Sequence, residues 1–329
     1  MKNSQTTLRQ APRPARWAGR GGQGERGTPF VLSRSKHERS NVLVSGGTGF
    51  LGSATGQALE QAGYPHQLLD ARSSGNGLEA ILSAIPETER TQATLIHLAG
   101  LSDARVAQED PGRAIDEVVR LTLQTVDLCV RFKLAKCILV SSATVYGQQR
   151  RQPVSEASSL NPQGIYAAAK AAAEWMARGR VAGESLALDI VRPGNILGPQ
   201  MHERTVVKEI LAQLRSRRHP VTVQSLRPRR DYIHVKDVAR ALVALLSSAS
   251  EKEPVRVFNI GTGRGTSALE LYRLLAQILG IPAEDPVETA PEEIRTFDLI
   301  LDTASLRQAT GWRPKISLEE SLRELVQRE

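Results

Sequence analysis

From Asn41 onward the chain alternates short apolar runs with amphipathic stretches, whereas the first 40 residues have no apolar periodicity. Apolar runs of four to eight residues bounded by turn signals are typical of buried strands, and apolar positions three or four residues apart are typical of helices. The pattern predicts strands beginning at residue 41 and over 66–69, 93–98, 136–141 and 186–192. It predicts helices ending near residue 62 and over 78–85, 107–132 and 165–179. Alternating strands and helices indicate βαβ units and a parallel sheet.

The predicted fold class is therefore α/β: a Rossmann-type doubly wound parallel sheet with a smaller C-terminal substrate lobe. After about Gly194 the strands become short and Pro and Arg become frequent. We expect a dinucleotide-binding domain over 41–194, to which 231–260 returns. The segments 195–230 and 261–329 are expected to form the substrate-binding lobe, over the carboxyl ends of the strands where open α/β sheets bind ligands.

The net charge of +8 is concentrated in the first 40 residues, which carry nine Lys or Arg and two Glu. Composition predicts a disordered basic tail, because so polar a segment buries too little surface to offset its chain entropy. The tail has no stretch apolar enough for a signal peptide or a membrane span. An organelle transit peptide, a polyanion-binding arm and an extension without a chemical role all stay open. We expect a cytoplasmic enzyme with no membrane partner, and nucleic acid is not expected as a partner.

Cysteine and histidine usage argues against disulfide and metal chemistry. Cys129 and Cys137 both stand in apolar surroundings, so we expect reduced core residues. The six histidines are scattered without metal-ligand spacing, and no metal is predicted.

A glycine-rich turn follows the first predicted strand and opens a helix. Its glycines at 46, 49 and 52 let the backbone approach a pyrophosphate, whose charge faces the free N–H groups of the helix start. The strand before it and the helix after it are the context that this motif requires. The residues expected to hold a dinucleotide here are Gly46, Thr48, Gly49, Phe50, Leu51 and Gly52.

An acidic residue ends the second predicted strand. Asp70 lies 21 residues after Gly49, where a carboxylate accepts hydrogen bonds from the adenosine ribose and repels a 2′-phosphate. This favours NAD over NADP. Arg72, two residues later, would favour NADP instead.

A tyrosine and a lysine four residues apart fall in the predicted helix 165–179. This spacing puts Tyr166 and Lys170 on one helical face. A neighbouring ammonium and the positive nicotinamide ring favour the phenolate and make Tyr166 a candidate general base for a sugar hydroxyl. Alone, the pair is a weak signal.

The order of the motifs along the chain strengthens the signal from the Tyr166–Lys170 pair. Glycine loop, acid, HLAG at 97–100, SSATVYG at 141–147 and YxxxK follow in the layout of the short-chain dehydrogenase/reductases. Over residues 41–322 the chain resembles their extended branch, the nucleotide-sugar epimerase/dehydratase family. The resemblance implies a catalytic Ser142 with Tyr166 and Lys170, bound NAD, and cofactor contacts from Leu98, Ala99 and Gly100.

The resemblance also implies substrate contacts. Ser142 and Thr144 belong to the catalytic serine segment, Asn195 to the RPGNILGP segment, and Arg230 to the strand–helix whose Arg meets the diphosphate. The chain departs from the family pattern where an Asn in the long helix is replaced by Val118. Arg295 is a weaker substrate candidate, because the usual Arg-x-Gly-Asp reads Arg-Thr-Phe-Asp here.

Two polar residues near Arg230 have simpler explanations than catalysis. Asp237 is expected to be a helix N-cap, and His234 a packed strand residue.

The residues after Ser142 bear on the reaction. Dehydratases of the resembling family carry an Asp-Glu pair there, while this chain has Ala143 and Thr144, which cannot do acid–base work at neutral pH. The segment is similar to that of UDP-hexose 4-epimerases, so an epimerase acting through a keto intermediate is expected. The alternatives are an NAD(P)-dependent reductase or dehydrogenase of a keto sugar or nucleoside, and a non-catalytic NAD-binding regulator.

We also expect a homodimer, as the resemblance implies, with the helices near 107–132 and 165–179 at its seam. The alanines at 167, 168, 171, 172 and 173 let partner helices approach closely. The alternative explanation of those alanines is helix propensity alone.

Overall fold

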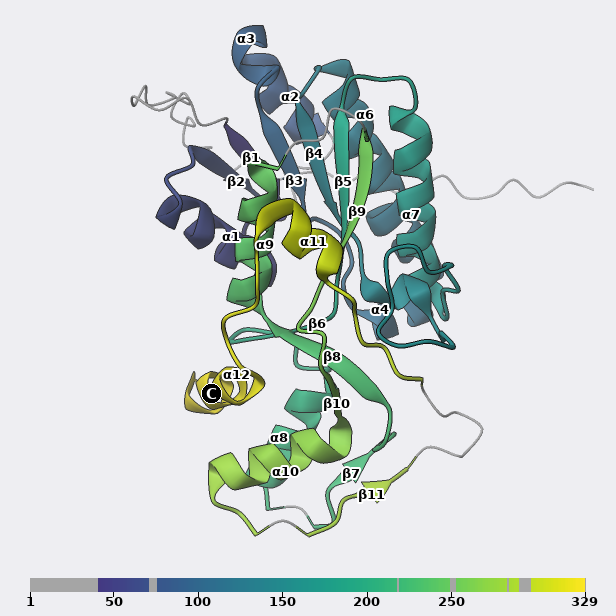
Figure 1. The fold of residues 1–329 in the computed structure, drawn as a ribbon, viewed down its shortest axis with the longest axis vertical. Coiled ribbons are helices and arrows are strands. Elements are labelled where there is room, and N and C mark those ends of the chain that lie inside the picture. Colours follow the sequence, from purple (N-terminus) through teal and green to yellow (C-terminus); the bar gives the residue numbers. More distant parts are fainter. Residues whose placement is uncertain are drawn as a thin grey trace, which may run out of the picture. The chain divides into compact units, whose positions relative to one another are not determined.

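A six-stranded parallel sheet forms the centre of the described part of the chain, in the order β2-β1-β3-β4-β5-β9 (Figure 1). The structure, a computed structural model, describes residues 41–70, 76–217, 219–248, 253–282, 284–289 and 297–328. The strands are β1 (Val42–Ser45), β2 (His66–Leu69), β3 (Thr94–His97), β4 (Lys136–Val140), β5 (Ala187–Pro193) and β9 (Val255–Ile260). The predicted α/β class is confirmed. The predicted tail, Arg72 and Arg295 lie outside the described residues.

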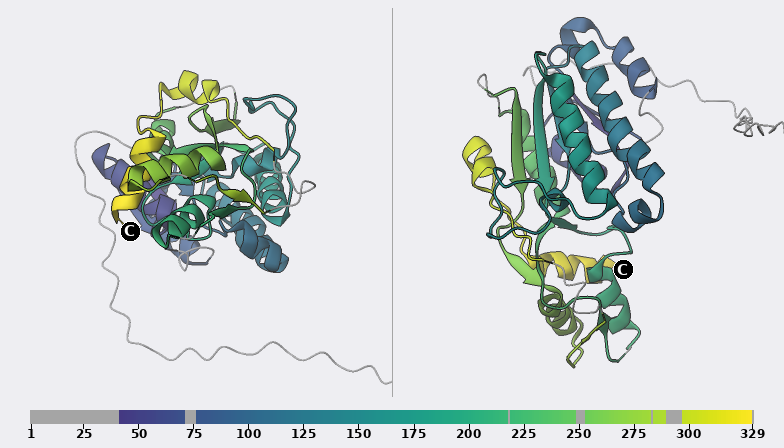
Figure 2. Two further views of the ribbon diagram at one scale, coloured as in Figure 1. Left: turned by 90° about the horizontal axis from the view of Figure 1, so that it is seen from below. Right: turned by 90° about the vertical axis from the view of Figure 1, so that its right-hand side faces the viewer.

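The inner strands of the sheet bury side chains on both faces. In β1, Val42 and Val44 pack into one core cluster and Leu43 into the other, as the two-residue strand period requires. Figures 1 and 2 show the covering helices on the two faces. One face carries α1 (Phe50–Gln61), α9 (Val235–Leu246) and α11 (Ala304–Thr310), and the other carries α2 (Asn76–Ala84), α6 (Leu121–Arg131) and α7 (Ile165–Val181). The short helix α3 (Glu87–Arg90) follows α2.

The single helix predicted over 107–132 is wrong in detail. The chain forms α4 (Ala104–Glu109), then α5 (Pro111–Ala114), a π-helical segment (Ile115–Arg120) and α6. Pro111 has no backbone N–H to continue α4, and the Asp110 side chain caps the next helix by accepting from the Arg113 N–H at 2.9 Å. The other predicted helices and strands named above are present, and their boundaries differ from the predicted ones by a few residues at most.

Beyond β5 the chain builds a second set of small sheets and helices. One sheet has the order β10 (Gly265–Ser267), β8 (Arg229–His234), β6 (Asn195–Leu197), and another pairs β11 (Val287–Glu288) with β7 (Thr222–Val223). The helices α8 (Val206–Arg215), α10 (Ala268–Leu279) and α12 (Leu318–Arg328) share a core that includes Leu211, Leu275 and Leu322. These apolar faces of three amphipathic helices enclose the core of this part of the chain.

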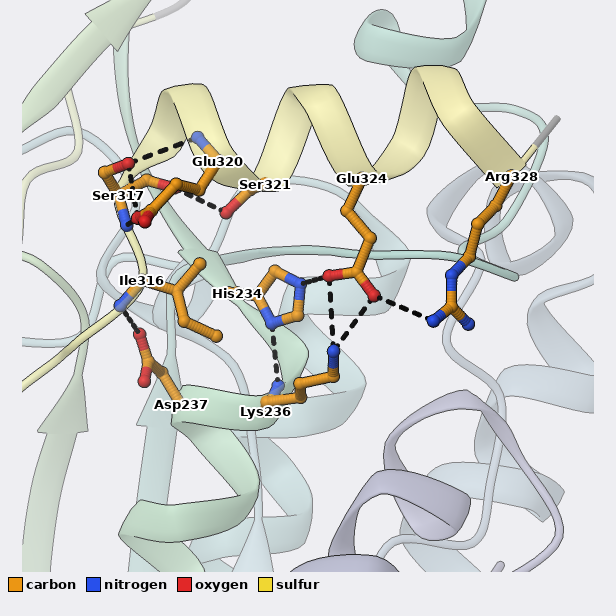
Figure 3. Close-up of polar contacts among 9 residues, drawn as sticks. All are labelled: His234, Lys236, Asp237, Ile316, Ser317, Glu320, Ser321, Glu324 and Arg328. Carbon is orange, nitrogen blue, oxygen red and sulfur yellow. Dashed lines mark hydrogen bonds and ion pairs between the residues drawn. The ribbon is translucent and has the colours of Figure 1, made fainter.

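A polar cluster ties α12 to the junction of β8 and α9 (Figure 3). His234 ends β8, is buried as expected, and also caps α9, because its Nδ1 accepts from the Lys236 N–H at 3.1 Å. Its Nε2 lies 3.0 Å from a carboxylate oxygen of Glu324 on α12. Asp237 is therefore not the N-cap that we expected. Its Oδ2 accepts from the backbone N–H groups of Lys315 and Ile316, at 3.0 and 2.9 Å.

Candidate active site

A cavity of about 460 Å³ lies at the carboxyl ends of the central strands. Its walls come from the segments that follow β1, β3, β4 and β5, from α7, and from the loop before α8. Of the predicted site residues, twelve line it: Gly46, Thr48, Gly49, Phe50, Leu51, Gly52, Leu98, Ala99, Gly100, Ser142, Tyr166 and Lys170. The carboxyl-end position agrees with the rule for ligand sites in open parallel sheets.

The glycine turn at the start of α1 fits a dinucleotide phosphate. Gly46 has φ +73°, and a Cβ there would lie 2.7 Å from the backbone nitrogen of Ala99. A Cβ on Gly52 would lie 2.2 Å from the carbonyl oxygen of Gly46, so the helix can approach the turn this closely only with glycine. Gly49 caps α1 without a side-chain hydrogen bond, which leaves N–H groups of the first turn to face a ligand. These residues fit the pyrophosphate of NAD.

The acidic ribose candidate lies beside this turn in the fold. Asp70 directly follows β2, whose neighbour in the sheet is β1, and its side chain is half-buried. It is not among the cavity-lining residues. Its role toward the ribose stays a prediction.

Ser142, Tyr166 and Lys170 meet at the inner wall of the cavity. The ammonium of Lys170 lies 5.9 Å from the centre of the Tyr166 ring and donates to the Val140 carbonyl at 3.2 Å. Ser142 follows β4 and hydrogen-bonds to Tyr166, and its Oγ also accepts from the Thr144 hydroxyl at 2.9 Å. The i, i+4 spacing on α7 and the end of β4 together bring the three side chains to one point.

Burial dominates the protonation of the Tyr–Lys pair. It raises the pKa of Tyr166 to about 12, against the opposite effect of the hydrogen bond with Ser142. It lowers the pKa of Lys170 to about 8, and the Glu174 carboxylate opposes this shift. The expected stabilisation of the phenolate is therefore not provided by the protein alone, because desolvation of the phenolate outweighs it.

A buried histidine lies behind this pair. His97, the first residue of HLAG, ends β3, and its Nδ1 lies 2.7 Å from the Ser45 Oγ. Its Nε2 lies 3.4 Å from the Thr122 Oγ1. Burial and the charge of Lys170 lower the pKa of His97 to about 3, so the ring is neutral at pH 7. The motif marks this position, but its burial and partners come from the fold.

A buried ion pair next to Lys170 was not predicted. Glu174 on α7 accepts from Arg192 on β5, from Nε at 3.0 Å and Nη2 at 2.5 Å. Arg192 also donates to the Tyr146 hydroxyl at 2.9 Å, and Tyr146 donates to Asn259 Oδ1 at 2.8 Å. Two signals point to the pair in the sequence: an acid four residues after Lys170, and an arginine inside an apolar strand.

Three predicted substrate residues do not line the cavity, and a fourth lies outside the residues that the structure describes. Thr144 and Asn195 are exposed and do not line the cavity. The Arg230 guanidinium stacks on the Phe297 ring, 5.2 Å from its centre, and donates to the Phe297 carbonyl. Arg295 is outside the described residues. The fold brings other residues to the cavity that sequence reasoning missed: Leu101, Ser102, Ile196, Met201, His202 and Thr205.

Among the residues that the structure describes, no group of three or more His, Cys, Asp or Glu side chains is arranged to hold a metal ion. No helix in that part of the chain is long and apolar enough to cross a membrane. Cys129 and Cys137 are both buried and unpaired.

The parallel sheet, the glycine cradle and the Ser–Tyr–Lys cluster define an extended short-chain dehydrogenase/reductase. The family model "NAD dependent epimerase/dehydratase family" matches residues 42–261, and the chain belongs to this family. It is 30% identical to a UDP-glucose 4-epimerase of Azospirillum brasilense, with 83% of this chain and 87% of that protein covered. A GDP-6-deoxy-D-mannose reductase of Pseudomonas aeruginosa is 29% identical, with 87% and 95% covered. The solved UDP-glucose 4-epimerase of Thermotoga maritima, in complex with UDP-glucose, is similar at TM-score 0.75 and 28% identity, with 88% and 98% covered.

Proposed function

We propose that this chain, an NAD-dependent nucleotide-sugar epimerase, inverts C4 of a UDP-linked hexose. The observation that carries the proposal is the meeting of Ser142, Tyr166 and Lys170 in one cavity with the glycine cradle. UDP-glucose 4-epimerases among the relatives support this choice of sugar nucleotide and carbon.

The protein's own residues divide the work of moving one proton. Tyr166 takes the proton of the sugar hydroxyl and later returns it, while the Ser142 hydroxyl holds the sugar oxygen in line. Because burial raises the pKa of Tyr166 to about 12, proton transfer needs positive charge at the site, and Lys170 supplies it from the same helical face. When bound, NAD supplies the acceptor and then the donor of the hydride at the sugar carbon.

The residues after Ser142 favour epimerisation over elimination of water. Ala143 is buried and apolar, and the Thr144 hydroxyl is engaged with Ser142 Oγ at 2.9 Å. Neither side chain can protonate a leaving hydroxyl at neutral pH. The keto sugar is therefore expected to rotate within the pocket, so that its opposite face is reduced.

The substrate lobe is proposed to comprise 195–230 and 261–329, with 231–260 belonging to the dinucleotide-binding domain. Asn195 and Arg230 are proposed to contact the sugar nucleotide, with Thr144 beside Ser142 and Arg295 as a further candidate. Arg230 would have to exchange its contact with the Phe297 carbonyl for the diphosphate. The charge of a diphosphate favours that exchange.

A turnover screen of UDP-, GDP-, dTDP- and CDP-sugars tests this function. The purified enzyme is expected to convert a UDP-hexose to its 4-epimer without added cofactor, with the redox state of bound NAD unchanged after turnover. Stoichiometric consumption of added NADH or NADPH with a keto sugar would instead establish the reductase alternative and contradict the proposal.

We further propose a homodimer that pairs α6 and α7 across a two-fold axis. Ala168, Ala172, Trp175 and Met176 form an exposed apolar stripe on α7, and Ile115 is exposed nearby at the start of the adjoining helical stretch. Ala167, Ala171 and Ala173 instead face the core. Exposed apolar stripes of this kind mark protein–protein contacts.

The unpaired cysteines support a location in a reducing compartment, which we propose is the cytoplasm.

A further inference from the structure

Glu174 is a buried carboxylate one helical turn after Lys170, with a relative exposure of 1%. It is shared by groups from two neighbouring strands. The Ser141 hydroxyl donates to its Oε1 at 2.5 Å, and Arg192 donates to both of its oxygens. The carboxylate thus joins the end of β4, the middle of α7 and the strand β5.

Two of these three elements, the end of β4 and α7, also carry the catalytic side chains Ser142 and Lys170. Ser141 immediately precedes Ser142, so the hydrogen bond to Glu174 fixes the turn that presents the Ser142 hydroxyl. Lys170 lies four residues before Glu174 on α7, a spacing that stacks their side chains about 5–6 Å apart at Cβ. One carboxylate is therefore placed to act on both Ser142 and Lys170.

Stability alone does not account for this ion pair. The desolvation of two buried charges offsets much of their attraction, and apolar replacements of such pairs are often neutral or stabilising. The pair also lies directly behind the cavity wall formed by Ser141, Ser142 and Lys170. A role at the site explains why charges are kept there.

The groups around Lys170 leave Glu174 as its stabilising counter-charge. Tyr166 and Glu174 face it from its own helix, the neutral ring of His97 from β3, and the Val140 carbonyl from β4. Beyond Glu174, Arg192 on β5 donates to the carboxylate, and the same carboxylate opposes the lowering of the pKa of Arg178 on α7 by burial. Glu174 is the charged neighbour that opposes the lowering of the pKa of Lys170 by burial.

We propose that Glu174 is a positioning residue, which keeps the Lys170 ammonium charged and fixes the Ser141–Ser142 turn. This inference rests on the proposed function, because it assigns Lys170 and Ser142 their catalytic roles. Glu174 itself acts through these neighbours and does not line the cavity.

The test compares Glu174→Gln with wild type as NAD-loaded enzyme. The alkaline limb of the kcat profile, where Lys170 loses its proton, should move to lower pH by about one unit or more, since a charge of opposite sign is lost a few ångströms away. kcat should fall more than KM rises at pH 8. Bound NAD should stay near one per chain.

Asp189→Asn is the matched control. Asp189 is equally buried and pairs with Lys136 at 2.7 Å and with Arg256, but at the other end of the same strands. It should lower the melting temperature without moving the alkaline limb. The proposal would be overturned if the alkaline limb of the kcat profile lay at the same pH in wild type, Glu174→Gln and Asp189→Asn.

If Glu174→Gln does not fold, the double variant Glu174→Gln/Arg192→Met removes the unpaired buried cation. The alkaline limb should still move to lower pH, because Glu174, and not Arg192, is the charge that acts on the pKa of Lys170. An unmoved limb overturns the proposal. NMR of 15N-lysine in the holoenzyme, assigned with Lys170→Met, follows the Lys170 pKa without turnover. Failure of the proposed function would appear as absent epimerisation by wild type, whereas failure of this inference would appear as an unchanged Lys170 pKa in the variant.

Discussion

The ammonium nitrogen of Lys170 lies 5.9 Å from the centre of the Tyr166 ring, and the two side chains share one wall of the cavity. Burial moves their two pKa values in opposite directions, to about 12 for Tyr166 and about 8 for Lys170. In both cases the neutral form gains. A positive charge on Lys170 and an anionic Tyr166 therefore support each other when a proton has to leave the sugar.

Tyr166→Phe should reduce kcat by about 10²- to 10⁴-fold, because the proton acceptor is removed while the ring keeps its packing. NAD content and melting temperature should stay close to the wild-type values. Initial rates measure kcat, the absorbance of released cofactor measures NAD content, and a melting curve gives the melting temperature. Near-normal turnover in this variant would be incompatible with the proposed chemistry.

Asp70→Ala should weaken NAD binding much more than NADP binding, since it removes both the ribose acceptor and the repulsion of a 2′-phosphate. Calorimetric titration of cofactor-free enzyme with each dinucleotide measures the two affinities. A wild-type enzyme that already prefers NADP would mean that Arg72 governs the choice and that our NAD assignment from Asp70 is wrong.

Acid should destabilise the protein through His97. The folded-state pKa is lowered to about 3, whereas the unfolded residue titrates near its ordinary value of 6.5. Between these values the unfolded chain binds the extra proton, so the free energy of unfolding falls as pH falls through 6.5, by up to about 1.4 kcal/mol per pH unit from this residue.

Urea unfolding of wild type and His97→Gln at pH 7 and pH 5 measures this contribution. Gln can keep a hydrogen bond with Ser45 but does not titrate. The variant should lose less free energy of unfolding than wild type between the two pH values. An equal loss in both would show that folding does not lower the pKa of His97.

Ala172→Trp should convert the proposed dimer to monomer, because the exposed small side chain is replaced by a bulky one on the apolar stripe of α7. NAD binding should be spared. Light scattering at micromolar concentration gives the mass. Ala309→Trp, at an exposed alanine of α11, is the matched control and should stay dimeric. A monomeric wild type would refute the dimer.

The central sheet was readable from the sequence because its signals are local. The run of apolar residues from Val42 and the glycines after it predict a strand, a phosphate turn and a helix without reference to the rest of the chain. The break at Pro111 was also local, but the strong apolar periodicity on both sides of it favoured a single helix. Asp237 has the composition of an N-cap, yet its carboxylate is bound by backbone N–H groups more than seventy residues later.

The site divides in the same way. Ser142, Tyr166 and Lys170 were found by spacing and motif order. The sequence marks Glu174 and Arg192 only one by one, by the spacing from Lys170 and by an arginine in an apolar strand. That Glu174 contacts Arg192, and Arg230 the Phe297 carbonyl, depends on how separate segments pack. The raised pKa of Tyr166 likewise follows from burial, which sequence spacing does not measure.

Isotope transfer tests the central claim most directly. A UDP-hexose deuterated at C4 is incubated with the enzyme, without added cofactor, in ordinary water. If hydride leaves and returns within one pocket, the 4-epimer keeps its deuterium at C4, and the solvent contributes none. Loss of the deuterium to water or to free NADH, or a product that is not the 4-epimer, would contradict the account.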